Sequence, residues 1–391
     1  MGSGCRDRPR RRTFLRASTG PGSLGQASRP VDLSPAPLPG GPSALAAPDL
    51  AHGPRRECVD ANADGLGSGP LETSVSEMPR RPLGRTGWEV SALGLGCASY
   101  WARPGFPEGQ ARAVFEAALE CGITLFDTGA SYAGGEAERR LGRLLRASPV
   151  PIDQLTVATK AGKRAAGRGR IIRDFSSDGI VEQVHQSLKR LGLERITLIQ
   201  LHGPAPGELT DELLTALDQL RMNGKLRFIG VNATADVLEH VVGRAPFDVV
   251  MPFVSVTRAH NVDVVRRAAD SGQGVLAAEP LARMRFAPPL ARWMTSRSGL
   301  WYIARALLRS SERLDVRRRR CLRNALDAPG WSPAQLALGW VLAQSEVSAA
   351  VFGTTRPKHV GELALACTRP LPKHVADAVA ACNRELPADP Q

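Results

Sequence analysis

The sequence predicts an α/β protein built as a (β/α)8 TIM barrel, with a β-hairpin before the barrel and a helical insertion after its seventh strand. Three observations predict this fold. Short apolar and β-branched runs alternate with helical patterns from residue 78 onward. Strands that alternate with helices are joined by crossovers and therefore pair in parallel. Eight such units follow one another, which is the number that closes this barrel.

The expected elements follow from the spacing of apolar residues. Strands are expected at 90–96, 123–126, 155–159, 196–201, 226–231, 247–253, 274–278 and 348–353. Helices, with apolar residues three and four apart, are expected at 111–120, 136–145, 180–191, 213–220, 237–242, 262–269 and 336–342. Asp178 and Ser332 stand where helix caps belong, and Gly192 and Gly224 stand where helices should stop.

Two segments lie outside the eight units. Residues 81–90 have the pattern of a hairpin with its turn at Arg85-Thr86-Gly87, and we expect it to plug the bottom of the barrel. Residues 288–327 form the insertion after strand seven. Their pattern is helical and basic, and they include Trp293, Trp301 and Tyr302.

The chain divides into an N-terminal extension, residues 1–77, and a barrel, residues 78–391. The extension holds 21 Gly and Pro residues, a single aromatic residue, Phe14, and no lysine. Such a segment buries too little apolar surface to offset its ordering entropy, so we expect disorder. Arg11-Arg12 resembles a twin-arginine export signal, but the apolar segment that such a signal needs is missing. A misassigned start, with Met78 as the true first residue, is a further hypothesis.

The composition is that of a globular chain, with 43% hydrophobic and 23% charged residues among 391. No apolar run approaches the ~18 residues that cross a bilayer, so we expect a soluble protein with no membrane partner. The net charge of +13 is local, because residues 281–323 hold 12 arginines against Glu312 and Asp315. No aromatic-interleaved motif accompanies them, which favours a solvated basic helix over a nucleic-acid contact.

The seven cysteines are odd in number and scattered, and the sequence has no C-x-x-C pair that could bind zinc or carry out redox chemistry. This pattern predicts reduced thiols, no metal site and a cytoplasmic protein.

Four candidate catalytic residues fall at the carboxyl ends of expected strands or in the loops that follow, where such barrels carry their reacting groups. Asp127 follows strand two, Tyr132 lies five residues further on, Lys160 ends strand three and His202 ends strand four. Taken singly, each residue could have a purely structural role, Asp127 as a helix cap, Tyr132 as a packed ring and His202 as a hydrogen-bonded side chain. Taken together, the four residues indicate a catalytic site.

The four side chains suit acid-assisted reduction of a carbonyl. A phenol ionises near pH ~10 and is a weak acid at neutral pH, and an ammonium beside it favours the phenolate. Lys160 supplies the ammonium and Asp127 its counter-charge, while His202 orients a carbonyl or shares the proton. The set lacks only a hydride donor.

These motifs resemble those of the aldo-keto reductase superfamily, in its bacterial type. Residues 83–87 (LGRTG) and 90–96 (VSALGLG) resemble the family's N-terminal hairpin and first strand, and residues 126–136 (FDTGASYAGGE) resemble its signature. Further matches follow in order at 159–160 (TK), 201–202 (LH), 224–231 (GKLRFIGV), 332–338 (SPAQLAL) and 353–359 (GTTRPKH). The resemblance covers residues 79–370, and ordered matches at eight places are specific where one would be weak.

The resemblance implies that Tyr132 is the general acid in carbonyl reduction and the base in alcohol oxidation. Lys160 and Asp127 would adjust the acidity of the Tyr132 hydroxyl, and His202 would orient the substrate oxygen. Hydride would come from a nicotinamide dinucleotide that lies extended across the top of the barrel. No G-x-G-x-x-G follows a strand and no Tyr-x-x-x-Lys occurs, which argues against a Rossmann-type dehydrogenase.

By the same resemblance, the loop after strand eight and the helix that it starts hold the adenosine end of the cofactor. Gly353, Thr354 and Thr355 offer backbone N–H groups and hydroxyls to phosphate. Arg356 or Lys358 faces a ribose 2′-phosphate, which favours NADPH, with NADH as the alternative. The alternative interpretation is that both cations are exposed on the first turn of the helix and bind no phosphate.

The remaining expected cofactor contacts are Asn232, Glu279, Leu281 and Glu362, the last to the adenine or a ribose. The chain also departs from the family here. Asn232 stands where many members begin a Ser-Asn pair, Met251 where they have Gln, and Ala278 where they stack an aromatic ring. Met251 cannot donate a hydrogen bond, so the nicotinamide is either held more weakly or held by other contacts.

The expected substrate is a small carbonyl or sugar compound. Tyr100 and Trp101 either wall its pocket or pack in the core. The leading function is an NADPH-dependent reductase of aldehydes or ketones. The alternatives are a sugar (aldose) dehydrogenase that uses NAD(P)+ and a non-catalytic dinucleotide-binding regulatory module, which the intact tetrad disfavours. Substrate identity, reaction direction and oligomeric state stay open.

Overall fold

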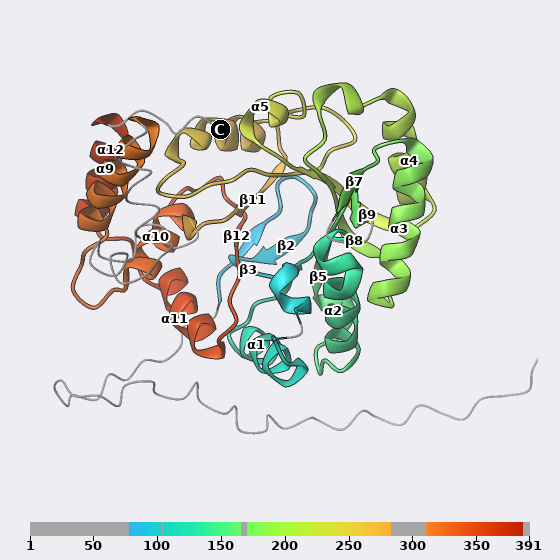
Figure 1. The fold of residues 1–391 in the computed structure, drawn as a ribbon, viewed down its shortest axis with the longest axis horizontal. Helices are drawn as coiled ribbons and strands as arrows, with labels where there is room; N and C mark the ends of the chain where they lie inside the picture. Colours follow the sequence, from blue (N-terminus) through green and yellow to red (C-terminus); the bar gives the residue numbers. More distant parts are fainter. Residues whose placement is uncertain (1–77, 104, 166–169, 283–309, 386–391) are drawn as a thin grey trace, which may run out of the picture. The chain divides into compact units, whose positions relative to one another are not determined.

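The computed structural model describes residues 78–385 apart from 104, 166–169 and 283–309 (Figure 1). The expectations for residues 1–77, and for Trp293, Trp301 and Tyr302, lie outside the described residues.

Eight parallel strands close into a barrel in the order β10-β11-β12-β3-β4-β5-β8-β9. Their bounds are β3 Leu93–Gly96, β4 Leu125–Asp127, β5 Thr156–Ala161, β8 Ile196–His202, β9 Leu226–Asn232, β10 Val249–Met251, β11 Gly274–Ala278 and β12 Ala349–Phe352. All eight expected strand regions contribute, so the predicted (β/α)8 fold is confirmed.

Helices lie outside the strands (Figure 1). They are α1 Glu108–Glu120, α2 Glu136–Arg146, α3 Ser177–Leu191, α4 Asp211–Met222, α5 Ala235–Leu238, α6 Val262–Asp270, α10 Pro333–Leu342 and α11 Pro357–Thr368. Helices α9 Ser310–Ala325 and α12 Lys373–Glu385 pack together. Short 3-10 helices are η1 Ser99–Ala102, η2 Tyr132–Gly135, η3 Ile152–Gln154, η4 Pro206–Glu208 and η5 Ala259–Asn261.

The barrel interior is a separate apolar cluster, distinct from the larger core between strands and helices. It takes alternate residues of the strands, among them Leu125, Ala158 and Leu198. Because side chains alternate across a strand, the residues two positions further on also point inward. At the carboxyl ends these are Asp127, Lys160 and Gln200, so a polar layer lies on top of the apolar ones.

The predicted hairpin is present and closes the amino end of the barrel. Strands β1 (Arg80–Pro82) and β2 (Glu89–Ser91) pair antiparallel. Leu83 in the connecting turn is fully buried in the interior cluster. Trp88 Nε1 donates to Thr156 Oγ1 at 2.9 Å, at the first residue of β5. Gly84 has φ +58 and lies against Gly274, where any Cβ would collide with the backbone.

The helix ends mostly follow the sequence signals. Ser332 caps α10 and forms a capping box with Gln335, as expected. Gly192 ends α3 with φ 70 in the left-handed region. The prediction for Asp178 is wrong: the cap of α3 is Ser176, whose hydroxyl accepts from Gly179 N–H, and Asp178 lies in the first turn. Two acceptors near one helix start cannot be ranked from spacing alone.

One expectation about the C-terminal region is wrong, and another holds only in part. Cys321 and Cys382 form a disulfide that joins α9 to α12, so the prediction of reduced thiols is wrong for this pair. The pair was not foreseeable because 61 residues separate the two cysteines. The basic helix is not uniformly solvated either: Arg318 is buried and donates to Asn383 Oδ1. No described helix is both long and apolar enough to span a bilayer.

Candidate functional site

The polar layer contains a buried ion pair. Lys160 Nζ contacts Asp127 Oδ2 and donates to the Thr128 carbonyl oxygen at 2.8 Å. Gln200 Nε2 donates to the other Asp127 oxygen at 2.9 Å. Neighbouring strands deliver all three side chains, since β4 pairs with β5 and β5 with β8.

Burial is the largest single influence on the pKa values of Asp127 and Lys160. Burial raises the pKa of Asp127 from its ordinary value, and Lys160 and Gln200 partly offset that rise. Burial alone would lower the pKa of Lys160, but its interactions with Asp127 and Tyr132 outweigh burial, and the Lys160 pKa is raised. The lysine is therefore a cation at neutral pH.

Tyr132 reaches this pair from a tight loop. The Lys160 ammonium lies 5.3 Å from the centroid of the Tyr132 ring. The ring packs over Gly129, where a Cβ would be 3.2 Å from it. After Tyr132, residues Ala133, Gly134 and Gly135 all have positive φ, a turn that only a glycine-rich sequence accommodates readily.

His202 faces Tyr132. Their ring planes are perpendicular, with centroids 5.8 Å apart. Burial lowers the pKa of His202 to about 3, and the charges of Lys160, Lys163 and Arg173 act in the same direction. Its buried Nδ1 has no hydrogen-bond partner among the described residues. A neutral imidazole with an unused nitrogen thus faces the phenol.

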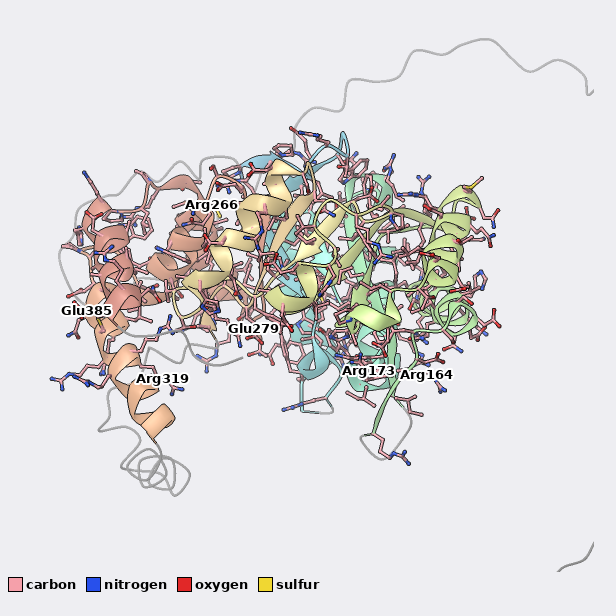
Figure 2. The ribbon with its side chains drawn as sticks, turned by 90° about the horizontal axis from the view of Figure 1, so that it is seen from above. Arg164, Arg173, Arg266, Glu279, Arg319 and Glu385 are labelled. Carbon is pink, nitrogen blue, oxygen red and sulfur yellow. A yellow bond between two sulfur atoms is a disulfide. The ribbon has the colours of Figure 1, made fainter. Side chains whose placement is uncertain are left out.

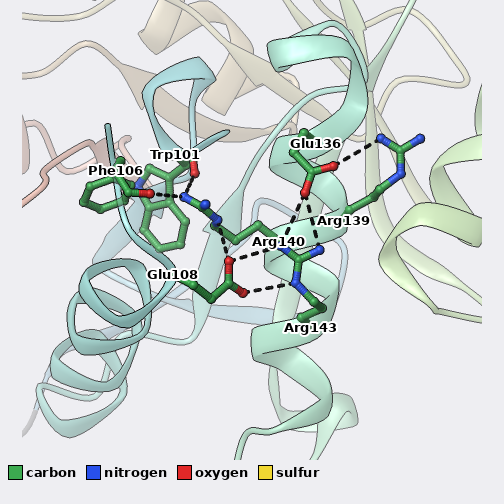
Figure 3. Close-up of polar contacts among 7 residues, drawn as sticks. All are labelled: Trp101, Phe106, Glu108, Glu136, Arg139, Arg140 and Arg143. Carbon is green, nitrogen blue, oxygen red and sulfur yellow. Dashed lines mark hydrogen bonds and ion pairs between the residues drawn. The ribbon is translucent and has the colours of Figure 1, made fainter. Parts of the chain in front are cut away.

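A network on the outer side holds the loops of the site in place (Figure 3). Arg140 on α2 donates to the carbonyl oxygens of Trp101 and Phe106, the latter at 2.8 Å. Glu108 at the start of α1 forms ion pairs with Arg140, at 2.8 Å, and with Arg143, at 3.1 Å. Helix α2, which directly follows the Tyr132 loop, is thereby tied to η1 and α1.

The loop after β12 presents two exposed cations. Arg356 and Lys358 are exposed at the start of α11, and neither has an ion-pair partner among the described residues. Thr354 is buried, and its Oγ1 accepts from Arg356 N–H at 3.1 Å. Gly353 and Thr355 are exposed, and the Thr355 carbonyl oxygen accepts from Gln110 at 2.7 Å. Backbone and side-chain donors are thus available to an anion here.

The other expected cofactor residues are more dispersed. Asn232 Nδ2 donates to the Met251 carbonyl oxygen at 2.9 Å, so one of its amide protons is already used. Glu279, with φ 51, forms an ion pair with Arg258 at 3.5 Å, and Leu281 packs against the core. Glu362 accepts a hydrogen bond of 2.6 Å from the Ser332 hydroxyl.

The two aromatic residues after β3, Tyr100 and Trp101, lie in different surroundings. Trp101 is fully buried and packs on Phe106, which places it in the core rather than at the site. Tyr100 is half-buried, and its hydroxyl donates to the Gly96 carbonyl oxygen at 2.9 Å. A Cβ on Gly353 would be 2.6 Å from this hydroxyl, so Tyr100 lies against the loop after β12.

Sequence reasoning missed Gln200, which fixes the orientation of Asp127. A signal was present, because a lone amide two residues before His202 must share its face of the strand. No cluster of metal-binding side chains occurs in the part of the chain that the structure describes.

Comparisons with known proteins agree with this geometry. Residues 92–384 match the model of the aldo/keto reductase family. The chain is 30% identical to L-galactose dehydrogenase of Arabidopsis thaliana over 75% of its length and 89% of the plant protein. It is 27% identical to the NADH-specific methylglyoxal reductase of Escherichia coli (strain K12), over 73% of this chain and 92% of the bacterial protein. A holo aldo-keto reductase from Bacillus halodurans superposes with a TM-score of 0.65 at 25% identity, covering 78% of this chain and 96% of that one.

Proposed function

The chain belongs to the aldo/keto reductase family, and from this premise we propose that it is an NADPH-dependent reductase of aldehyde or ketone carbonyls. Members of this family are generally NAD(P)H-dependent oxidoreductases. The proposal adds the direction, the cofactor and the residues that carry the chemistry.

Tyr132 is the proton donor in this proposal. The cationic Lys160 beside its ring favours the phenolate that remains after the proton has left. Asp127 keeps that cation in place, and Gln200 keeps Asp127 in place. His202, neutral and perpendicular to the Tyr132 ring, donates a hydrogen bond to the carbonyl oxygen and orients it toward the phenol.

The residues present fit a nicotinamide dinucleotide phosphate. When bound, the cofactor supplies the hydride. Arg356 and Lys358, exposed and without acidic partners among the described residues, would hold a 2′-phosphate. Gly353 and Thr355 would present backbone groups to the other phosphates, and Asn232 would bond the carboxamide through its remaining amide groups.

The observation that carries the proposal is the contact of Lys160 with both Asp127 and Tyr132. Tyr132→Phe removes the proton donor and keeps the ring, so reduction of an aldehyde panel with NADPH should slow by about 10²- to 10⁴-fold in kcat. Binding of NADPH, followed by fluorescence titration, should stay as in the wild type. Equal turnover by both proteins would remove the catalytic assignment.

One similarity favours a second candidate, an aldose dehydrogenase that works in the oxidative direction. The plant protein that is 30% identical carries the name L-galactose dehydrogenase. Initial rates with aldoses and NAD+ or NADP+, compared with aldehydes and NADPH or NADH, separate the two candidates. In the oxidative direction the same Tyr132 would act as the base.

A further inference from the structure

We propose that Lys163 binds an anionic group of the substrate, so that the carbonyl compounds best suited to this site carry a carboxylate or a phosphate. This inference rests on the proposed function and names the substrate class of the same site.

Lys163 lies at the rim beside His202. It is the first residue of β6 (Lys163–Ala165), three residues after Lys160, and its side chain is half-buried. The β6 strand pairs with β7 (Ile171–Arg173) in a hairpin that follows β5. The ammonium reaches the loop after β8, because a Cβ on Gly203 would be 3.1 Å from Lys163 Nζ. A substrate whose oxygen meets His202 therefore has this cation close by.

The nearby acids are already engaged with other partners. Asp127 pairs with Lys160, and Glu208 pairs with Arg173 while also accepting from the Ala205 N–H at 2.7 Å. No carboxylate lies within ion-pair distance of Lys163 among the described residues. Burial lowers the pKa of Lys163, the charge of Arg173 adds to this, and the charge of Glu208 opposes it. An anion arriving at Lys163 would supply the missing counter-charge.

The position of Lys163 points to the substrate rather than to the dinucleotide. Arg356 and Lys358, the proposed phosphate contacts, follow β12, which β3 and β4 separate from β5 in the barrel. Figure 2 shows Arg173 of the Lys163 hairpin and Glu279 after β11 apart from each other along the same edge of the barrel. The hairpin thus serves a different part of the site from the β12 loop.

The test compares charged aldehydes with related neutral ones. One pair is 4-carboxybenzaldehyde and methyl 4-formylbenzoate, and the other is glyceraldehyde 3-phosphate and glyceraldehyde. With NADPH as reductant, Lys163→Gln should lower the charged-to-neutral ratio of kcat/KM about tenfold, mainly through KM, and Lys163→Arg should restore it. The aldehyde pair whose ratio changes shows whether Lys163 binds a carboxylate or a phosphate.

Arg164→Gln is the matched control. Arg164 is the next residue of β6, is exposed, and lines a cavity of about 410 Å³ on the α3 side together with Asp174 and Glu182. Removing this cation should leave both ratios unchanged. A ratio that is the same in wild type and Lys163→Gln for both pairs would overturn the inference while the proposed function stands. No turnover of any of the four aldehydes by the wild type would overturn the proposed function, and the role of Lys163 with it.

Discussion

Burial, reinforced by the cationic side chains around His202, keeps its imidazole neutral. Lys160, Lys163 and Arg173 all act against a positive charge on the ring, and burial does so most strongly. A neutral imidazole has one N–H and one lone pair, so in the proposed reaction it would orient a carbonyl oxygen by donating a hydrogen bond. In the proposed reduction Tyr132 would then be the proton source, and His202 would bind the carbonyl oxygen while Tyr132 acts as the acid.

The low pKa of His202 predicts a pH-dependent stability difference. In the unfolded chain a histidine titrates near pH ~6.5, whereas in the folded protein His202 titrates at about 3. Below pH ~6.5 the unfolded state therefore binds the proton first, and folding loses up to ~1.4 kcal/mol per pH unit. His202→Gln should escape this loss, so its stability relative to wild type should rise as the pH falls toward about 3.

Urea titrations at several pH values between 7.5 and 4 would measure this difference. His185→Gln, at an exposed position of α3, is the control and should follow the wild type. If wild type and His202→Gln had the same pH dependence, the imidazole would not be held neutral by the fold.

At the scale of elements, the β1–β2 hairpin completes the barrel that holds the site. Leu83 enters the interior cluster from the amino end, while Asp127, Lys160 and Gln200 lie in the layer at the carboxyl end. The same strands carry both layers, so loosening of the interior changes the spacing between their polar ends.

Leu83→Ala tests this closure. Removing a fully buried leucine side chain should lower the free energy of unfolding by about 2–5 kcal/mol. Met222→Ala, at a position that is 85% exposed on α4, is the control and should change it by less than about 0.5 kcal/mol. Denaturant unfolding measures both variants. A small effect at Leu83 would mean that the hairpin does not seal the barrel.

At the scale of the whole molecule, the Cys321–Cys382 disulfide closes a loop of the chain that contains α10, β12 and α11. The residues proposed to hold the cofactor phosphates lie inside this loop. A cross-link of this kind restricts mainly the unfolded chain, and the effect grows with loop length. The disulfide therefore bears on the stability of the part of the barrel that is proposed to bind the cofactor.

The variant with both Cys321→Ser and Cys382→Ser should lose about 2–4 kcal/mol of unfolding free energy. Adding a reductant should destabilise the wild type by a similar amount and leave the double variant unaffected. Peptide mapping without reduction should recover the linked pair from the oxidised protein. If both cysteines were labelled as thiols in that protein, the disulfide would be excluded.

The sequence by itself determined the eight strands, the closing hairpin and the positions of Asp127, Tyr132, Lys160 and His202. These follow from local properties, namely the period of apolar residues and the place where each strand ends. Parallel strands deliver their ends to one rim, so residues far apart in the chain were expected to meet, and the structure brings these four together.

Only the tertiary structure decided which side chains are partners. Gln200 orients Asp127, Cys321 meets Cys382, Glu362 bonds Ser332, and Trp101 is in the core. Lys163 reaches Gly203 from the β6–β7 hairpin that follows β5. None of these pairings has a repeating spacing in the sequence. They depend on how barrel closure and the surrounding helices place distant segments side by side, and therefore on the packing of the whole barrel.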